Sequence, residues 1–113
     1  MSNNIFAIFV PSTLSGDIKI SDSAFEKRTE TVAHAFCSIF GGCNVIASNG
    51  YWLADNGKLI AEKTNIVWAL DLDNKVDARV RDILWTDYAS QCRIKWAQYC
   101  VLVIIAGQAK LVK

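Results

Sequence analysis

The residues with the clearest chemical potential lie in two short stretches near the middle of the chain. Gly50 and Tyr51 stand in the first stretch and Glu62 stands in the second, with the sequence Asp-Asn-Gly-Lys at residues 55–58 between them. Asp-Asn-Gly is typical of a tight turn that joins two paired strands. If the two arms pair, we expect the Tyr51 phenol and the Glu62 carboxylate to lie across from each other. A polar cross-strand pair can also be purely structural, and the pattern alone leaves both interpretations open.

The segment after the first predicted strand is a second candidate for ligand contact. Pro11 ends that strand, and Ser12 and Thr13 follow it. A loop at this place can present amides and hydroxyl groups to a ligand, although an ordinary polar loop is the simpler interpretation. Gly50 adds to the case, because glycine within a strand often marks the close approach of a ligand or of another backbone.

The common catalytic and metal-binding signatures are absent from the sequence. There is no Gly-x-Ser-x-Gly elbow, no phosphate-binding glycine loop and no dinucleotide fingerprint. The one histidine, His34, lies within a helical pattern, and the four cysteines at positions 37, 43, 92 and 100 form no Cys-x-x-Cys pair. We therefore expect no metal and no cofactor. The cysteines are interpreted as small buried hydrophobic residues.

Composition limits the partners that the protein can have. Twelve basic and eleven acidic residues give a net charge of +1, and they are scattered singly. This balance gives no electrostatic reason to expect nucleic acid or an anionic membrane as a partner. The sequence shows no apolar run of the roughly 18–20 residues that span a bilayer and no signal peptide. We expect one domain over residues 1–113 and a cytoplasmic location.

Hydrophobic periodicity predicts an alternation of strands and helices. Ser23 and Glu26 fit a capping box, and Gly41 provides a helix stop. The predicted elements are a strand at 5–10, a helix at 23–40, strands at 43–48 and 64–72, a helix from Asn74 to about Trp96, a strand at 99–105 and a short edge strand at 109–112.

This order is that of an α+β protein with the ferredoxin-like split βαβ (βαββαβ) arrangement, in which two helices cover one face of an antiparallel sheet. The strands are apolar on both sides, as residues 5–10 show with Ile-Phe-Ala-Ile-Phe-Val. Two helices cannot cover both faces, so the second face is expected to be buried in an oligomer. Many ferredoxin-like chains achieve this as trimers.

Three features taken together resemble the bacteriophage S-adenosylmethionine (SAM) lyases, formerly called SAM hydrolases. They are the Gly50-Tyr51 step, the Glu-Lys-Thr arm that starts at Glu62, eleven residues beyond the tyrosine, and the run Trp-Ala-Gln-Tyr-Cys-Val-Leu-Val at 96–103. The resemblance covers residues 42–112, and the first forty residues fit only in the order of their elements. Trp52 stands where a charged or polar residue is expected, which is a departure from the family pattern.

The resemblance implies a homotrimer with the fold of the PII signalling proteins and with substrate clefts between subunits. It further implies that the methionine carboxylate of SAM attacks its own γ-carbon and releases homoserine lactone and 5′-methylthioadenosine. By position, Tyr51 and Glu62 match the family's active-site residues. We take Pro11, Ser12 and Gly50 as the candidate substrate contacts. If the chain is phage-encoded, its location is the host cytoplasm.

Two other classes of function remain open at this stage. The first is a PII-like sensor that binds an adenine compound without converting it. The second is a phage-encoded interaction protein that inhibits a host enzyme through its hairpin. Binding of SAM separates the interaction protein from the other two classes, and product formation separates the lyase from the sensor.

Overall fold

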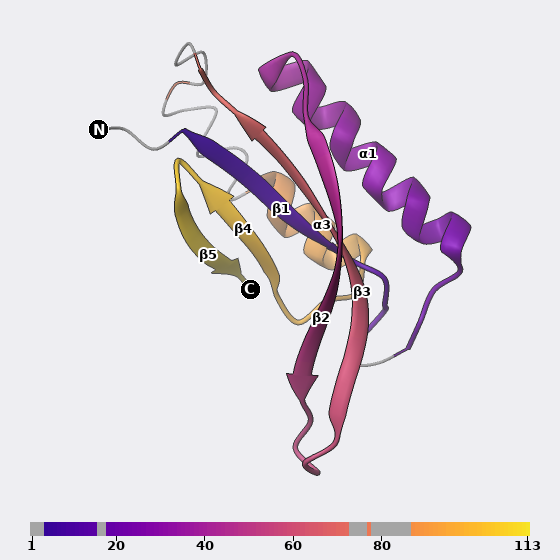
Figure 1. The fold of residues 1–113 in the computed structure, drawn as a ribbon. Helices are drawn as coiled ribbons and strands as arrows, with labels where there is room; N and C mark the ends of the chain where they lie inside the picture. Colours follow the sequence, from indigo (N-terminus) through magenta and orange to yellow (C-terminus); the bar gives the residue numbers. More distant parts are fainter. Residues whose placement is uncertain (1–3, 16–17, 73–76, 78–86) are drawn as a thin grey trace.

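The computed structural model describes residues 4–15, 18–72, 77 and 87–113 of the chain. One antiparallel sheet forms the centre of the fold, and its strands follow the order β2-β3-β1-β4-β5 (Figure 1). The strands are β1 (Ile5–Pro11), β2 (Asn44–Leu53), β3 (Leu59–Leu70), β4 (Val101–Ile105) and β5 (Gln108–Val112). The described helices are α1 (Asp22–Phe40) and α3 (Ala89–Lys95). This arrangement confirms the predicted ferredoxin-like α+β class.

The central position of β1 follows from its sequence. The strand pairs with β3 on one side and β4 on the other, so its backbone is satisfied along both edges. Phe6, Ile8 and Val10 are at most 2% exposed and point toward the helices. An apolar strand gains most from burial in the middle of a sheet, where neighbouring strands on both sides help to cover its side chains.

Both helices pack on the same face of the sheet. Val32 and Phe36 of α1 are fully buried against the sheet, and Cys92 of α3 and Trp96 just beyond it join the same cluster. The complete set of buried cluster residues is Phe6, Ile8, Val10, Val32, Phe36, Val67, Ala69, Ala89, Cys92, Trp96, Val101, Val103 and Ile105. This single core holds the two described helices against the sheet.

The start of α1 differs slightly from the prediction. The N-cap is Ser21, whose hydroxyl accepts a hydrogen bond from the Ala24 amide, whereas Ser23 lies within the helix. Both serines stand before the apolar stripe, so the sequence pattern alone does not distinguish them. The helix ends as predicted at Gly41, whose φ of 85° is the left-handed conformation that glycine adopts most easily.

Other elements extend or shorten the predicted ranges. The hairpin strands β2 and β3 are both longer than expected, because the apolar cores of 43–48 and 64–72 continue into the polar arms on either side of the turn. The predicted edge strand at 109–112 is confirmed as β5. Of the helix expected between Asn74 and Trp96, the described part is α3; residues 73–76 and 78–86 lie outside the described residues.

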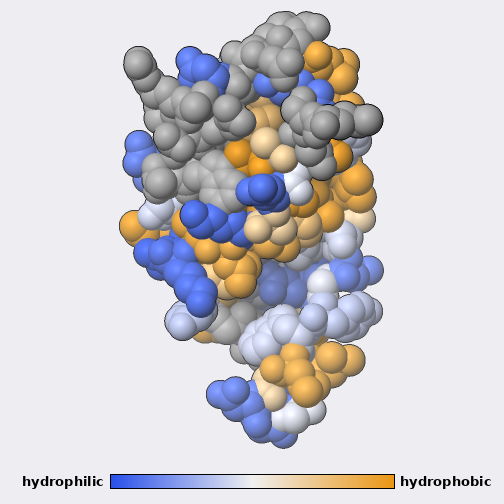
Figure 2. Space-filling view, turned by 90° about the vertical axis from the view of Figure 1, so that its left-hand side faces the viewer, coloured by the Kyte–Doolittle hydropathy of each residue, from blue (hydrophilic) through white to orange (hydrophobic). Residues whose placement is uncertain are grey.

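The sheet face opposite the helices carries exposed apolar side chains on four of its strands. Alternation along the strands places Ile5, Ile46, Leu70 and Leu111 on this face, and they are between 39% and 50% exposed. Figure 2 shows hydrophobic side chains, in orange, at the surface on the side of the molecule that lies to the left in Figure 1. Scattered exposed leucines are common on proteins, whereas apolar residues on four strands of one sheet face form a candidate contact surface. This confirms the expectation that the described helices of a single chain leave one apolar face of the sheet uncovered.

Two predictions about single residues have different outcomes. His34 is an exposed residue on α1, as the helix-face interpretation predicted. The interpretation of all four cysteines as buried is wrong: Cys92 is buried, Cys43 and Cys100 are half-buried, and Cys37 is exposed. Cys37 lies in the last turn of α1, one position beyond the buried Phe36, so the helix turns its side chain away from the core. In the described part of the chain, no helix is long and apolar enough to cross a membrane.

Candidate functional site: a cleft beside the β2–β3 hairpin

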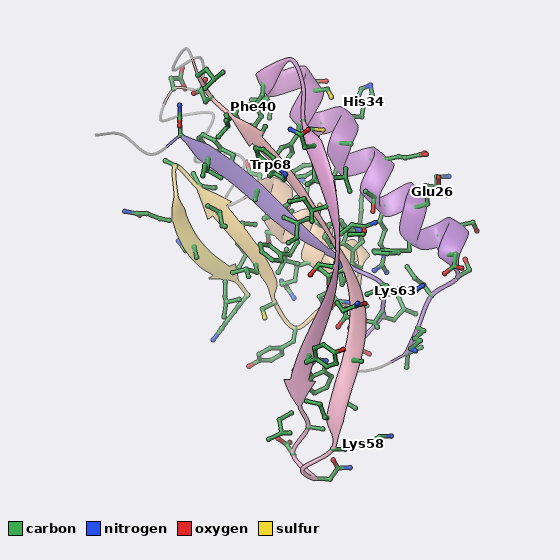
Figure 3. All side chains as sticks on the ribbon, in the orientation of Figure 1. Glu26, His34, Phe40, Lys58, Lys63 and Trp68 are labelled. Carbon is green, nitrogen blue, oxygen red and sulfur yellow. The ribbon has the colours of Figure 1, made fainter. Side chains whose placement is uncertain are left out.

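The β2–β3 hairpin projects well beyond the body of the fold (Figure 1). Its turn spans Ala54 to Lys58, the Ala54 amide donates a hydrogen bond of 2.9 Å to the Lys58 carbonyl oxygen, and Gly57 adopts a φ of 82°. The Asn56 side chain accepts a further bond from the Lys58 amide at 2.9 Å. The predicted Asp-Asn-Gly turn is therefore confirmed. Figure 3 shows Lys58 at the free end of the hairpin and Lys63 further up β3.

The register of the hairpin corrects the expected pairing of Tyr51 with Glu62. Tyr51 lies opposite Ala61, and Glu62 lies opposite Gly50. Side chains alternate between the two faces of a strand, so Tyr51 and Glu62 of one chain point to opposite faces of the hairpin. The cause is the odd number of residues in the loop between Leu53 and Leu59, the first paired residues.

A cleft of two adjoining cavities lies where the hairpin joins the body, with volumes of about 300 and about 380 Å³. Asp22 and Phe25 at the start of α1 and Asn49 and Lys63 of the hairpin line both cavities. The first cavity is also lined by Ser12, Lys19, Ile20, Ala61 and Glu62, and the second by Ala47, Ser48 and Asn65. Clefts of this size accept a nucleoside-sized ligand.

The cleft brings together some of the predicted site residues and separates others. Ser12 and Glu62 both line the first cavity although fifty positions separate them in sequence. Pro11 is buried at the end of β1, and its carbonyl oxygen accepts a hydrogen bond from Arg28 at 2.9 Å. Tyr51 is 65% exposed on the outer half of the hairpin, and neither Tyr51 nor Gly50 lines the described cavities.

Gly50 has room for a larger residue. A methyl group in place of its hydrogen would lie 3.5 Å from the Thr64 hydroxyl oxygen and 3.7 Å from the Glu62 carbonyl oxygen, which are ordinary contacts. Within one chain, the backbone therefore gives no steric reason for glycine at this position.

Glu62 is held from the side of the first strand. β1 ends at Pro11, which lies opposite Thr64 of β3. Beyond this pair β3 has no partner from β1, so the edge of β3 is open beside Glu62. The Thr13 hydroxyl occupies this space and donates a hydrogen bond of 3.1 Å to Oε1 of Glu62. Thr13 itself is only 3% exposed, whereas Glu62 is half-buried. One carboxylate oxygen is thus bound to the protein interior at the wall of the cleft.

Two long side chains fix the backbone around Thr13. Arg28 of α1 donates to the carbonyl oxygens of Pro11 and Thr13 at 2.9 Å each, and its guanidinium carbon lies 5.7 Å from the centre of the Trp96 ring. Gln98 donates to the Thr13 carbonyl oxygen at 2.7 Å. Burial lowers the pKa of Arg28 below its usual value, and the negative charge of Glu62 partly offsets this effect.

Sequence reasoning missed Arg28 and Gln98. A signal for Arg28 was available, because it falls on the apolar stripe of α1 between Phe25 and Val32, where a positive charge has no packing role. A charge at such a position must find polar partners inside the fold. Gln98 lies in the run at 96–103 that contributes to the family resemblance, but no local pattern indicates its contact with Thr13, which depends on the tertiary structure.

The described walls of the cleft carry charges of both signs. Lys19, Lys63, Asp22 and Glu62 line the first cavity together. Within the described residues, no three histidine, cysteine, aspartate or glutamate side chains gather in a way that could hold a metal ion. A ligand that itself carries a cation and a carboxylate would find complementary groups on these walls.

The strand order, the two helices on one face and the single core define the ferredoxin-like class of α+β proteins. Within that class, the chain is similar to a phage SAM lyase solved in complex with S-methyl-5′-thioadenosine, with a TM-score of 0.68 and 17% sequence identity over 100% of this chain and 92% of the other. It is also similar to a phage SAM lyase in the apo state, with a TM-score of 0.64 and 15% identity over 99% and 90% of the two chains. The chain therefore has the fold of these lyases. No family model and no curated protein matches its sequence.

Proposed function

We propose that the protein is a SAM lyase that converts SAM to homoserine lactone and 5′-methylthioadenosine without a cofactor. The observation that carries this proposal is the cleft at the base of the hairpin, with Glu62 on its wall, in a chain that has the fold of the phage SAM lyases over its full length. The similar structure that contains S-methyl-5′-thioadenosine supports a nucleoside ligand of this size.

The reaction makes small demands on the protein. The methionine carboxylate forms a bond to its own γ-carbon while the bond from that carbon to the sulfonium sulfur breaks. The electron pair stays on sulfur, which becomes a neutral thioether, and no proton has to move. Nucleophile and leaving group belong to one molecule, so holding the carboxylate, γ-carbon and sulfur in line provides most of the acceleration.

Glu62 and Lys63 are suited to hold the two ends of the reacting group. The negative charge of Glu62 attracts the sulfonium, and Lys63, which lines both cavities, supplies a positive charge for the substrate carboxylate. Excessive attraction to the sulfonium would slow the reaction, because positive charge disperses in the transition state. The role we assign to Glu62 is therefore to position the substrate. Ser12 is the remaining wall residue among the expected contacts, and Pro11 and Gly50 stay predictions.

Tyr51 takes part in this proposal only through assembly. It points away from Glu62 of its own chain and is largely exposed, so it can meet a Glu62 carboxylate only in a neighbouring copy. The exposed apolar face of the sheet supports association of copies. We propose a homotrimer in which Tyr51 of one subunit completes the cleft of the next. We further propose a cytoplasmic location, which is the host cytoplasm if the chain is phage-encoded.

The test is product analysis with purified protein, SAM and no added cofactor. The proposal predicts 5′-methylthioadenosine and homoserine lactone, with the same yield in EDTA. In isotopically labelled water, lactone trapped early should contain no solvent oxygen, because its ring oxygen comes from the substrate carboxylate. Intact SAM after long incubation would disprove the lyase. Tight binding in that sample would then indicate a sensor, and no binding would indicate an interaction protein.

A further inference from the structure

The contact between Thr13 and Glu62 joins the cleft to a buried hydrogen-bond network. Thr13 is 3% exposed, and its hydroxyl donates to Oε1 of Glu62 at 3.1 Å. Glu62 is the only one of the two expected catalytic residues on the wall of the described cavities. A glutamate side chain has several rotatable bonds, so its carboxylate needs an external partner to keep one orientation.

The Thr13 hydroxyl is attached to a backbone that several hydrogen bonds hold in place. The Thr13 carbonyl oxygen accepts hydrogen bonds from Arg28 at 2.9 Å and from Gln98 at 2.7 Å. Backbone hydrogen bonds join its two neighbours to the segment beyond the loop, from the Leu14 amide to Ile18 at 2.7 Å and from the Ile20 amide to Ser12 at 3.0 Å. A β-branched side chain on so fixed a backbone has few rotamers available.

We infer that Thr13 is a positioning residue for Glu62, and that Arg28 and Gln98 set its place by holding the loop after β1. The hydroxyl binds one carboxylate oxygen and thereby directs the other toward the cleft. This inference rests on the proposed function, because it assigns a role within the same reaction. It adds a residue that does not touch the substrate and acts only through Glu62.

The chemistry of the bond gives the size of the expected effect. A hydrogen bond to a carboxylate is stronger than one between neutral groups, and it fixes geometry as well as charge. Removal of the hydroxyl leaves the carboxylate free to rotate between the cleft and solvent. We therefore expect Thr13→Val, which keeps the shape of the side chain, to lower kcat by about 10- to 100-fold, with a smaller change in KM.

Thr13→Ser retains the hydroxyl and should keep most of the wild-type kcat. Thr31→Val is the matched control, since Thr31 is an exposed threonine of α1 whose hydroxyl donates to the Lys27 carbonyl oxygen. This control should behave as wild type in activity. Thermal unfolding of each variant checks that the fold is intact, and Thr13→Ala replaces Thr13→Val if the valine variant does not fold.

A double-mutant cycle with Glu62→Ala, which removes the hydrogen-bond acceptor, separates positioning from a general structural role. If Thr13 acts through the Glu62 carboxylate, Thr13→Val should cost only about threefold or less in the Glu62→Ala background. An equal loss in both backgrounds, or a Thr13→Val enzyme within twofold of wild type, would overturn the inference while leaving the lyase proposal standing. A wild-type protein that forms no 5′-methylthioadenosine would instead overturn the proposed function, and the inference with it.

Discussion

Replacement of Glu62 by glutamine tests the electrostatic part of the proposed site. The substitution keeps the size of the side chain and an oxygen that can accept the Thr13 hydroxyl, but it removes the negative charge. Two unit charges about 4 Å apart attract by about 1 kcal/mol in water and by about 4 kcal/mol at the lower effective dielectric near a protein surface. Glu62 is half-buried, so its attraction for a sulfonium should lie between these limits.

This range corresponds to a fall of about 5- to 1,000-fold in kcat/KM for Glu62→Gln. The assay is chromatographic measurement of 5′-methylthioadenosine at several SAM concentrations. Added salt should lower kcat/KM of the wild type and have less effect on the variant, because salt screens the charge that the variant lacks. Activity within twofold of wild type, with the same salt dependence, would refute the assignment of Glu62.

Three further predictions concern the assembly and the fold. Light scattering should give three times the 12.5 kDa chain mass. Ile46→Asp on the exposed sheet face should dissociate the assembly. A monomer mass for the wild type would contradict a cleft shared between subunits. Arg28→Met should lower the unfolding temperature by about 5 °C or more, because it removes one hydrogen-bond donor from each of two carbonyl oxygens, those of the buried residues Pro11 and Thr13. An unchanged melting curve would contradict the role of Arg28 as a clamp. The Sγ atoms of Cys37 and Cys43 lie 3.7 Å apart, so treatment with a small-molecule disulfide should form an intramolecular bond that Cys37→Ser abolishes. Burial raises the pKa of Cys43 to about 11, and we expect this oxidation to become faster as the pH rises toward that value; a reaction independent of pH would contradict it.

The fold was predictable because its strongest signals are local and agree with one another. The apolar run of β1 ends at a proline, Gly41 stops α1, and Asp-Asn-Gly forms the turn of the hairpin. Each signal acts within a few residues of its position, and tertiary packing does not oppose any of them. The order of elements then limits the possible topologies to very few.

The relation between Tyr51 and Glu62 was not predictable to the same degree. The sequence indicates a turn near Gly57 but does not state how many residues stay unpaired, and one residue more or less moves Tyr51 to the other face. The exposure of Cys37 has a similar cause, since neighbouring helix positions such as Phe36 differ completely in burial. Such predictions require the face on which a side chain lies to be known to within one residue, and periodic patterns do not define it that closely.

The hydrogen bond from Gln98 to Thr13 spans 85 positions of the chain. A ribosome therefore releases the loop after β1, the start of α1 and the whole hairpin well before the residue that completes the clamp on that loop. Contacts between distant segments also form late in folding, because the intervening chain must first be ordered. The nascent protein can thus contain every residue that lines the described cavities while the clamp on the loop after β1 still lacks Gln98.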